Sequence, residues 1–584
     1  MVVDFPGTES AAPALQDFSL ELYRGELLAV VGESGSGKSV MALTLMNLLS
    51  KAARVMQGSI LFSPDGMEAV NLLGMPEKKL RSFRGNQLAM IFQEPMTSLN
   101  PVMTCGMQLI EPLMLHKKLS RSQAGKEALL LFEKVQLPEP ERVFHKYPHQ
   151  LSGGQKQRVM IAMAISCNPA VLICDEPTTA LDVRVQKTIL DLLKDLRRTE
   201  NIGMIFITHD LGLVGDMADR AIVMLRGRVV ETGPVKDLFM NPQHPYTKGL
   251  LMCRPALHVK GERLPVLSDF MENMDSETAE NAIETMLKPD PPINFKTISE
   301  SPLKDKPDPV TGREILLSVK GLHLRYSSGK NWLGREKLWV DAIRDINFDI
   351  YRGETLGLVG ESGSGKSTLG RALLGLKVPV QGTISYGGED LTGMSKSALL
   401  DFRRNIQIVF QDPYSSLNPR LMIGPAISEP LQVHDTLSRS ERKDRVLEWL
   451  QKVNLKPQHF IRYPHAFSGG QRQRIVIARA LVLNPGFVVF DESVSALDVS
   501  VQAQILNLIN DLKANLGFTA LFISHDLSVI RYLCDRVLVM ENGKIVESGN
   551  VENVYTHPQT AYTRTLIDAI PGRNLKAPSP KPKA

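Results

Sequence analysis

Two identical stretches carry the residues with the clearest chemistry. The sequence VGESGSGKS occupies residues 31–39 and again residues 359–367. Both copies satisfy the pattern G-x-x-x-x-G-K-[ST]. In this pattern the glycines let backbone N–H groups close around phosphate oxygens, the lysine adds a cation at the β- and γ-phosphates, and the hydroxyl reaches Mg²⁺. The sequence therefore predicts two phosphate-binding loops, built on Gly32, Gly37, Lys38 and Ser39, and on Gly360, Gly365, Lys366 and Ser367.

A pair of neighbouring carboxylates follows each loop farther along the chain. Apolar runs end in Asp175-Glu176 and in Asp491-Glu492, each 23 residues after the first residue of an SGGQ sequence. The aspartate of such a pair can hold Mg²⁺ through water, and the glutamate can orient an attacking water and accept its proton. An isolated Asp-Glu pair is more often a solvated turn, but the repeated spacing favours the catalytic interpretation.

The two carboxylate stretches differ in one respect. The first reads CDEPTTALD and the second FDESVSALD, so that Ser493 stands where the first copy has Pro177. Loss of the proline frees one backbone torsion but removes neither a metal ligand nor a base. We therefore predict two competent sites.

The sequences LSGGQ and FSGGQ place a hydroxyl and two glycines immediately before a helical stretch. Such a helix N-terminus can bind an anion, yet each half already has a phosphate loop. A second cradle in each half indicates that the halves pair face to face, each SGGQ closing on the nucleotide of the other. The residues are Ser152, Gly153, Gly154 and Gln155, and Ser468, Gly469, Gly470 and Gln471.

Four further polar residues are expected at the ligand end of the fold. His209 and His525 each follow an apolar run and precede an aspartate, where contact with a γ-phosphate is expected. Gln93 and Gln411 lie at strand ends before proline-containing loops, within reach of Mg²⁺ or the attacking water. A lone histidine or glutamine at such a place is usually structural, so these assignments depend on the surrounding motifs.

Short apolar strands and helices must position these residues. Residues 26–31 and 355–360 read as strands that run into the phosphate loops, and residues 39–49 and 367–376 as the helices that follow. Further buried strands are predicted at residues 170–174, 203–208, 487–490 and 519–524. Strands that alternate with helices predict an α/β fold with a mainly parallel sheet and ligands at the carboxyl ends of the strands.

All landmarks occur twice in the same order, which identifies an internal duplication. Ser152 and Ser468 are separated by 316 residues, as are Asp175 and Asp491. A chain of 584 residues also exceeds the size of a single core. We predict a first domain at 1–254, a linker at 255–313 rich in Pro, Asp, Glu, Lys and Ser, a second domain at 314–571 and a disordered C-terminus at 572–584. A short helix is possible within the linker at 274–287.

Composition excludes several classes of function. The net charge of +5 is mild, and no dense Lys/Arg block predicts a nucleic-acid groove. Five scattered cysteines without a CxxC pair favour a reducing compartment and argue against a disulfide framework or structural zinc. No apolar run of 18 residues and no basic-then-apolar leader is present. We therefore expect a soluble chain that acts at a membrane only through a partner.

Taken together, the Walker A, Gln-loop, SGGQ, Walker B, D-loop (residues 180–182 and 496–498) and His-loop motifs resemble the nucleotide-binding domain of ABC transporters, in both halves. The resemblance implies two tandem P-loop NTPase domains, each with a RecA-like core, an antiparallel β subdomain and a helical subdomain. It implies ATP hydrolysis with Mg²⁺. The implied catalytic residues are Glu176, Glu492, His209, His525, Gln93 and Gln411, and the implied metal ligands are Ser39, Gln93, Asp175, Ser367, Gln411 and Asp491.

The same resemblance implies where ATP binds. One ATP is expected against Gly32, Glu33, Ser34, Gly35, Ser36, Gly37, Lys38 and Ser39, opposite Ser468, Gly469, Gly470 and Gln471. The second is expected against Gly360, Glu361, Ser362, Gly363, Ser364, Gly365, Lys366, Ser367 and Thr368, opposite Ser152, Gly153, Gly154 and Gln155. The aromatic residues that match the adenine platform are Phe5 and Tyr326. Only four residues precede Phe5, so the first domain is expected to lack its edge strand. Either the start codon has been placed too late or the first adenine contact is loosened.

Two tail sequences narrow the family. NPQHPYTKGLL at 241–251 and the weaker HPQTAYTRTLI at 557–567 are similar to the tail of peptide and nickel importers. The fused domains and the DESVSALDVS stretch most resemble the ATP-binding subunit of bacterial glutathione importers. The resemblance implies two transmembrane permease subunits, a periplasmic substrate-binding protein and a place on the cytoplasmic face of the inner membrane. The cysteine-rich tail of some relatives is absent, so no iron–sulfur cluster is expected.

Alternatives remain open from the sequence. Dipeptides, longer peptides and nickel are other substrates of this group of importers. A ribosome-associated tandem ATPase also lacks membrane spans but usually carries a long, charged helical linker, whereas this linker is broken by prolines. A DNA-repair ATPase of this type would require zinc-binding cysteine clusters.

Overall fold

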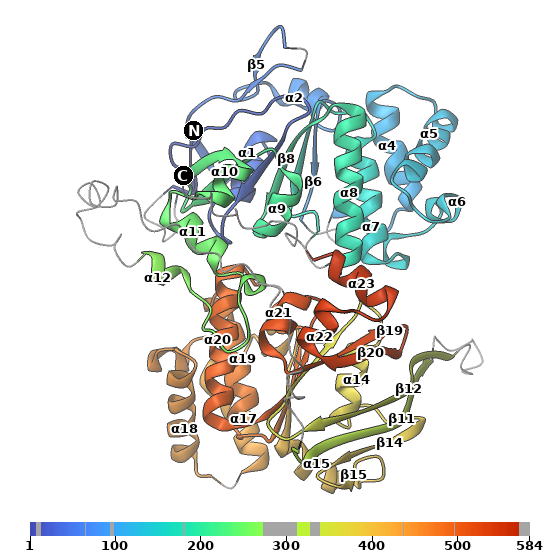
Figure 1. The fold of residues 1–584 in the computed structure, drawn as a ribbon. Helices are drawn as coiled ribbons and strands as arrows, with labels where there is room; N and C mark the ends of the chain where they lie inside the picture. Colours follow the sequence, from blue (N-terminus) through green and yellow to red (C-terminus); the bar gives the residue numbers. More distant parts are fainter. Residues whose placement is uncertain are drawn as a thin grey trace, which may run out of the picture.

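Two α/β domains of similar architecture make up the chain. The computed structural model describes residues 1–6, 13–64, 66–93, 98–178, 181–271, 312–327, 339–435, 437–495 and 497–570. The first half of the chain forms the upper domain in Figure 1 and the second half the lower domain. The possible helix at 274–287 and the C-terminus at 572–584 lie outside the described residues.

Each domain is built on a six-stranded sheet with one antiparallel edge. In the first domain β2 lies between β8 and β9, parallel to both, and β10 pairs antiparallel with β9. Every residue of β2 and β8 is buried, as expected for strands covered on both faces. The strands in spatial order are β10 (Arg228–Pro234), β9 (Arg220–Leu225), β2 (Leu27–Val31), β8 (Gly203–Thr208), β7 (Val171–Asp175) and β6 (Leu88–Ile91).

The second domain repeats this sheet strand for strand. Its central strand β13 pairs in parallel with β18 and β19, and β20 closes the edge in the antiparallel sense. The strands in spatial order are β16 (Ile406–Val409), β17 (Phe487–Asp491), β18 (Thr519–Ile523), β13 (Thr355–Val359), β19 (Arg536–Glu541) and β20 (Lys544–Asn550). The buried strands predicted from the sequence are thereby confirmed, and so is the duplication.

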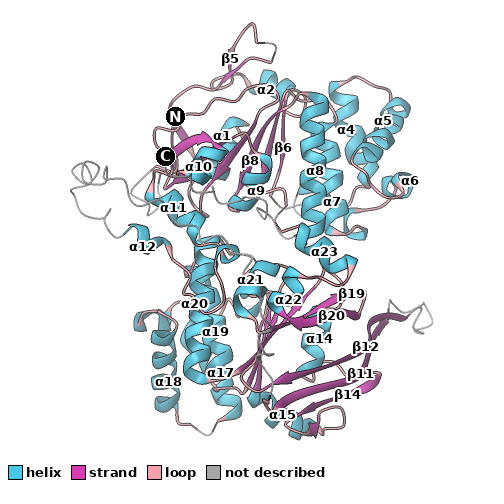
Figure 2. Ribbon diagram, in the orientation of Figure 1, coloured by secondary structure: helices cyan, strands magenta, loops and turns pink. Residues whose placement is uncertain are grey.

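Helices cover both faces of the sheets, as Figure 2 shows in cyan. Those of the first domain are α1 (Lys38–Leu45), α2 (Glu77–Phe83), α4 (Cys105–His116), α5 (Arg121–Lys134), α6 (Pro140–Phe144), η1 (Pro148–Gln150), α7 (Gly153–Ile165), α8 (Val183–Glu200), α9 (Leu211–Met217), α10 (Val235–Met240) and α11 (Pro245–Met252). Those of the second domain are α14 (Lys366–Leu373), α15 (Lys396–Asn405), α16 (Pro413–Ser416), α17 (Ile423–His434), α18 (Arg439–Lys452), η3 (Pro457–Ile461), η4 (Pro464–Ala466), α19 (Gly469–Leu481), α20 (Val499–Leu516), α21 (Leu527–Leu533), α22 (Val551–Thr556) and α23 (Ala561–Asp568). Helices α4 to α6 and α17 to α18 form the predicted helical subdomains.

The antiparallel subdomain is full in the second domain and reduced in the first. In the second, β11 (Ile315–Ser327), β12 (Trp339–Tyr351), β14 (Gln381–Tyr386) and β15 (Glu389–Asp390) form one sheet. In the first, β1 (Val2–Asp4) pairs with β3 (Arg54–Gln57), and β4 (Leu61–Phe62) pairs with β5 (Val70–Asn71). The expectation that the first domain lacks this edge strand was therefore wrong. Three residues suffice because Val3 is fully buried and pairs with Leu15 through two backbone hydrogen bonds.

The beginning of the predicted linker packs onto the second domain. After η2 (Pro255–Leu257), the chain runs over α20 and α21 to α12 (Leu267–Met271). Leu264 is 1% exposed, and its backbone N–H and C=O both bond the side chain of Asn507, at 3.0 and 2.8 Å. Residues 255–271 thus fasten the first domain to the second, a role that their polar composition did not indicate.

Among the described residues, no helix combines the length and the apolar character needed to cross a membrane.

Candidate functional site

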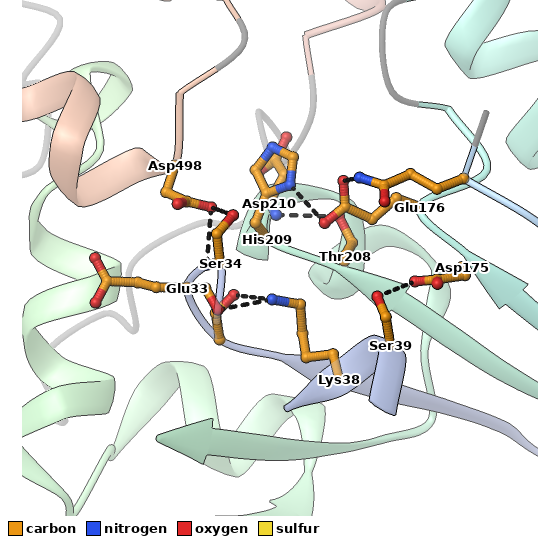
Figure 3. A network of polar contacts seen from close by, with 12 residues as sticks. Glu33, Ser34, Lys38, Ser39, Asp175, Glu176, Thr208, His209, Asp210 and Asp498 are labelled. Carbon is orange, nitrogen blue, oxygen red and sulfur yellow. Dashed lines mark hydrogen bonds and ion pairs between the residues drawn. The ribbon is translucent and has the colours of Figure 1, made fainter. Parts of the chain in front are cut away.

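The phosphate loops have the same geometry in both domains. Gly37 and Gly365 cap the following helices with φ of 102° and 107°, in the left-handed region that glycine adopts most easily. Lys38 Nζ donates to the carbonyl oxygens of Gly32 and Glu33 at 2.8 and 2.9 Å. Figure 3 shows the Lys38 side chain turned toward the backbone of the loop. Lys366 makes the equivalent bonds at 2.8 Å. Burial lowers the pKa of both lysines. Each loop therefore closes around its lysine in the shape expected of a phosphate-binding loop.

The predicted metal ligands lie in contact with one another. Ser39 Oγ donates to Asp175 Oδ1 at 3.3 Å, and Ser367 Oγ donates to Asp491 Oδ1 at 2.9 Å. The two aspartates are the last residues of β7 and β17, and burial raises the pKa of both carboxyls. A hydroxyl and a carboxylate side by side are oxygen ligands of the kind that Mg²⁺ prefers.

The predicted bases are held in an unusual backbone conformation. Glu176 and Glu492 each have φ of 46°, which is uncommon for a residue with a side chain. The backbone N–H of each bonds the neighbouring strand, Glu176 to Ile207 O and Glu492 to Ile523 O, both at 3.0 Å. The two copies share this geometry although proline follows only Glu176, so Ser493 does not disturb the second base.

A histidine and a glutamine converge on each glutamate. In the first domain, Glu176 Oε1 lies 3.2 Å from His209 Nδ1, and Glu176 Oε2 accepts from Gln93 Nε2 at 3.2 Å. In Figure 3, His209 and Glu176 face each other above the phosphate loop. Burial lowers the pKa of His209, but the hydrogen bond and the charge of Glu176 outweigh it, so the net pKa is raised.

The second domain repeats this cluster with a shorter glutamine contact and a longer histidine contact. Gln411 Nε2 donates to Glu492 Oε2 at 2.8 Å, and His525 Nδ1 lies 3.5 Å from the same oxygen. Lys366 Nζ lies 3.9 Å from Glu492 Oε1. Burial raises the pKa of Glu492, but the hydrogen bond and charge of His525 outweigh it and hold this pKa below its ordinary value. This lowered pKa favours the carboxylate form of Glu492, which is the form that accepts a proton.

Each SGGQ sequence begins a helix, as predicted, and its serine and glutamine form a capping box at the start of that helix. Ser152 Oγ accepts from the Gln155 N–H at 3.3 Å, and Ser468 Oγ accepts from the Gln471 N–H at 3.3 Å. Ser152 and Ser468 are exposed on the domain surface. An exposed, capped helix N-terminus is suited to an anion supplied by the other domain.

The second glycine of each signature has a packing role that the sequence did not reveal. A Cβ on Gly154 would lie 2.6 Å from Val185 Cγ1, and a Cβ on Gly470 would lie 2.3 Å from Val501 Cγ1. These approaches join α7 to α8 and α19 to α20, so each signature helix is set against the helix that follows the D-loop.

The domains meet at their phosphate loops. Asp498 Oδ1 of the second domain accepts from the backbone N–H and hydroxyl of Ser34 in the first, at 3.2 and 3.0 Å (Figure 3). The equivalent Asp182 instead caps its own helix α8, accepting from Val185 N–H at 2.9 Å. The two D-loop aspartates therefore have different hydrogen-bond partners.

The aromatic residues predicted to contact adenine have different surroundings. Tyr326 ends β11, its hydroxyl donates to Thr368 Oγ1 at 3.3 Å, and Lys377 Nζ lies 4.9 Å from its ring centre. Phe5 follows β1, and its backbone N–H bonds Asp4 Oδ1 at 2.9 Å. Tyr326 thus lies beside its phosphate loop's helix, whereas the role of Phe5 stays a prediction.

Sequence reasoning missed two tyrosines in the tails. The backbone N–H of Glu33 donates to Tyr246 Oη, and that of Glu361 to Tyr562 Oη, both at 3.0 Å. The signal in the sequence is the tyrosine that the HPYT and TAYT stretches of the two tails share.

Both the fold and the site are those of an ATP-binding cassette, and family comparison agrees. The model of the ABC transporter family matches residues 15–179 and 343–495, and that of the oligopeptide/dipeptide transporter C-terminal region matches residues 230–276 and 546–581. The chain belongs to the ABC transporter family and is an ABC-type ATPase with two tandem ATP-binding domains.

Within this family the chain is similar to proteins named "Glutathione import ATP-binding protein GsiA". The protein of Escherichia coli (strain K12) is 47% identical over 575 residues, which cover 97% of this chain and 88% of the relative. The protein of Shigella flexneri has the same identity and coverage. The fused arrangement of domains is therefore shared with these relatives over nearly the whole chain.

Solved structures of single cassettes match smaller parts of the chain. A dimeric structure of MJ0796 in a post-hydrolysis state, bound to ADP and Pi, is 28% identical with a TM-score of 0.37, covering 40% of this chain and 99% of that one. The structure of cbiO1 from Clostridium perfringens is 29% identical with a TM-score of 0.37, covering 42% of this chain and 92% of that one.

Proposed function

We propose that the chain is the ATP-hydrolysing subunit of an importer for glutathione or other small peptides. The observation that carries the proposal is the pair of complete ATPase clusters that meet across one interface, together with an importer-type tail on each domain. Fusion of the two domains in one chain, as in the relatives, favours glutathione among the substrates of this group.

ATP would bind between each phosphate loop and the signature helix of the other domain. Lys38 and the loop amides would hold the phosphates on one side, with Ser468 at its helix N-terminus on the other. Contact between Asp498 and Ser34 supports this face-to-face arrangement. The mirrored site would use Lys366 and Ser152.

Hydrolysis would proceed through an attacking water. Glu176 or Glu492 would orient the water and accept its proton. His209 lies against the first carboxylate, and His525 holds the pKa of the second below its ordinary value. His209 and Gln93 contact the first glutamate and would keep it in place, and His525 and Gln411 would do so for the second. The developing charge on the phosphoryl oxygens would be stabilised by Lys38 or Lys366.

Mg²⁺ fits the donors at each site. Ser39 and Asp175 would hold it in the first domain, with Gln93 nearby, and Ser367, Asp491 and Gln411 in the second. When bound with ATP, the ion would neutralise charge on the β- and γ-phosphates.

The proposed assembly places the chain on the cytoplasmic face of the inner membrane, docked on two permease subunits fed by a periplasmic binding protein. ATP would close the two domains, hydrolysis would reopen them, and the segment after each Gln-loop would pass this motion to the permeases. The match of both tails to the peptide-transporter C-terminal region supports such partners.

The proposal is tested by isolating the native complex from membranes and by uptake of labelled glutathione in intact cells. Two permease subunits should co-purify, and uptake should depend on the chain. The matched control carries Glu176→Gln and Glu492→Gln together, which should preserve the complex and abolish uptake. A complex isolated without permeases would contradict the importer, while uptake of dipeptides or nickel alone would correct only the substrate.

A further inference from the structure

A glutamate opens each phosphate loop, directly after its first glycine. Glu33 follows Gly32, and Glu361 follows Gly360. A carboxylate turned into the loop would repel the phosphates that the loop is built to hold. In Figure 3 the carboxylate of Glu33 points away from Lys38. The side chain is therefore held outward, and its partners show what holds it.

Glu33 is bonded by both domains at once. Its backbone N–H donates to Tyr246 Oη on the tail of its own domain at 3.0 Å, and Tyr246 is 1% exposed. Its carboxylate accepts a hydrogen bond from the hydroxyl of Ser500, the second residue of α20 in the other domain. Ser500 is also 1% exposed and Glu33 is half-buried, so the donor of this link between the domains is shielded from water.

Glu361 has the mirrored partners but a different donor. Its backbone N–H donates to Tyr562 Oη on its own tail at 3.0 Å, and its carboxylate accepts from Arg184 Nη1 at 3.0 Å. Arg184 is the second residue of α8, the position equivalent to Ser500. The side chains of Arg184 and Glu361 are 55% and 29% exposed, so this link is an ion pair in contact with water.

The tail of the second domain reinforces the same contact. Lys187, one turn beyond Arg184 on α8, donates to the carbonyl oxygen of Asp568 at the end of α23 at 3.1 Å. Tyr562 lies six residues earlier on α23, about 9 Å along the helix axis. One short helix therefore connects this phosphate loop to the other domain's α8 at a second point.

We propose that Glu33 and Glu361 are positioning residues that latch each phosphate loop to the opposite domain, and that the two latches respond differently to salt. Each latch exists only when the first turn of the partner helix lies against the loop, so it orders the loop as the domains close. The Ser500–Glu33 latch is a hydrogen bond from a buried, uncharged hydroxyl. The Arg184–Glu361 latch is a partly exposed ion pair that salt screens.

The test measures ATP hydrolysis by the full chain as a function of ATP and of sodium chloride. At low salt, Glu361→Gln and Arg184→Ala should each raise KM for ATP about two- to fivefold, with kcat changed less than about twofold, because the latch acts on binding and closure. Above about 0.5 M salt the difference from the wild type should vanish, since the ion pair is then screened. Arg184→Lys should restore most of the low-salt KM.

The matched pair in the first site should behave differently. Glu33→Ala and Ser500→Ala should raise KM by a similar factor at low and at high salt, because each removes one side of a hydrogen bond that is not an ion pair. In each site the double variant should be no worse than the more affected single variant, since both remove the same link.

Several results would overturn the latch. Unchanged KM in all four single variants would show that the glutamates do not position the loops. Additive effects within a pair would show that the two residues act separately. A salt-independent effect of Arg184→Ala would exclude an ionic latch, and because this side chain is largely exposed, loss of folding is not expected to mask the outcome.

Discussion

Replacement of Glu492 by glutamine tests whether the second site is a working one. The surroundings of Glu492 match those of Glu176, with the same φ of 46° and the same histidine and glutamine contacts. Glutamine keeps the size of the side chain and an oxygen for Gln411 but cannot accept a proton from water. Loss of a general base lowers a rate by about 10²–10⁴ at the affected site. If the two sites depend on each other through the shared interface, turnover of the full chain should fall by at least about tenfold.

Phosphate release by the assembled transporter at saturating ATP measures the effect. Glu176→Gln is the matched variant of the first site and should lose turnover to a similar degree. Ser493→Pro is the matched control, because it restores the residue of the first copy and touches no member of the cluster; its turnover should stay within about twofold of the wild type. Near-normal turnover in Glu492→Gln alone would refute the reasoning and show that the second site is idle.

Three further predictions concern packing, charge and the tail. Gly470→Ala should lower the free energy of unfolding by about 1–3 kcal/mol, because its Cβ would lie 2.3 Å from Val501 Cγ1. Gly469→Ala is the control and should unfold like the wild type, because the nearest atom to its Cβ would lie 3.9 Å away. Equal effects of the two variants in chemical denaturation would contradict this packing argument. Burial lowers the pKa of Lys513 to about 8, below the ordinary 10.5, so the folded state disfavours the charged form. As pH rises from about 8 to about 10.5, the wild type should therefore gain stability relative to Lys513→Met, and it should show no such gain below about pH 8. Thermal unfolding of both proteins measures this gain. A stability difference between them that stays constant with pH would exclude this titration. Tyr562→Phe removes one hydroxyl from the phosphate loop's N–H and should raise KM for ATP about two- to tenfold at the second site, while a wild-type KM would show that the loop holds its shape without the tail.

Local patterns were enough to predict the central strands of each sheet and the residues that gather in each cluster. The phosphate loop directly follows the strand at Leu27–Val31, and the base Glu176 directly follows the strand at Val171–Asp175, so each is encoded together with the strand that positions it. Their chemistry is also specific, since a lysine in a glycine-rich turn after a buried strand has few alternatives. Duplication helped further, because every weak signal could be checked at its second occurrence.

The sequence misled where a short segment depends on distant packing. The edge strand Val2–Asp4 is too short to be expected from its pattern, but Val3 gains a buried place against Leu15. The polar stretch around Leu264 looked like free linker, yet that one leucine enters the core of the second domain. In such segments a single buried side chain determines where the chain packs. The average composition of the segment does not reveal that one residue.

The sequence by itself determined that the chain holds two P-loop ATPase domains, each with the same series of motifs, because each motif is a local pattern. Only the tertiary structure decided how the sets are joined. Ser34 and Asp498 lie 464 residues apart in the chain, and Arg184 and Glu361 lie 177 apart. Contacts at such separations are fixed by how two folded surfaces meet, so no pattern within either half could reveal that one loop is held by a hydroxyl and the other by an ion pair.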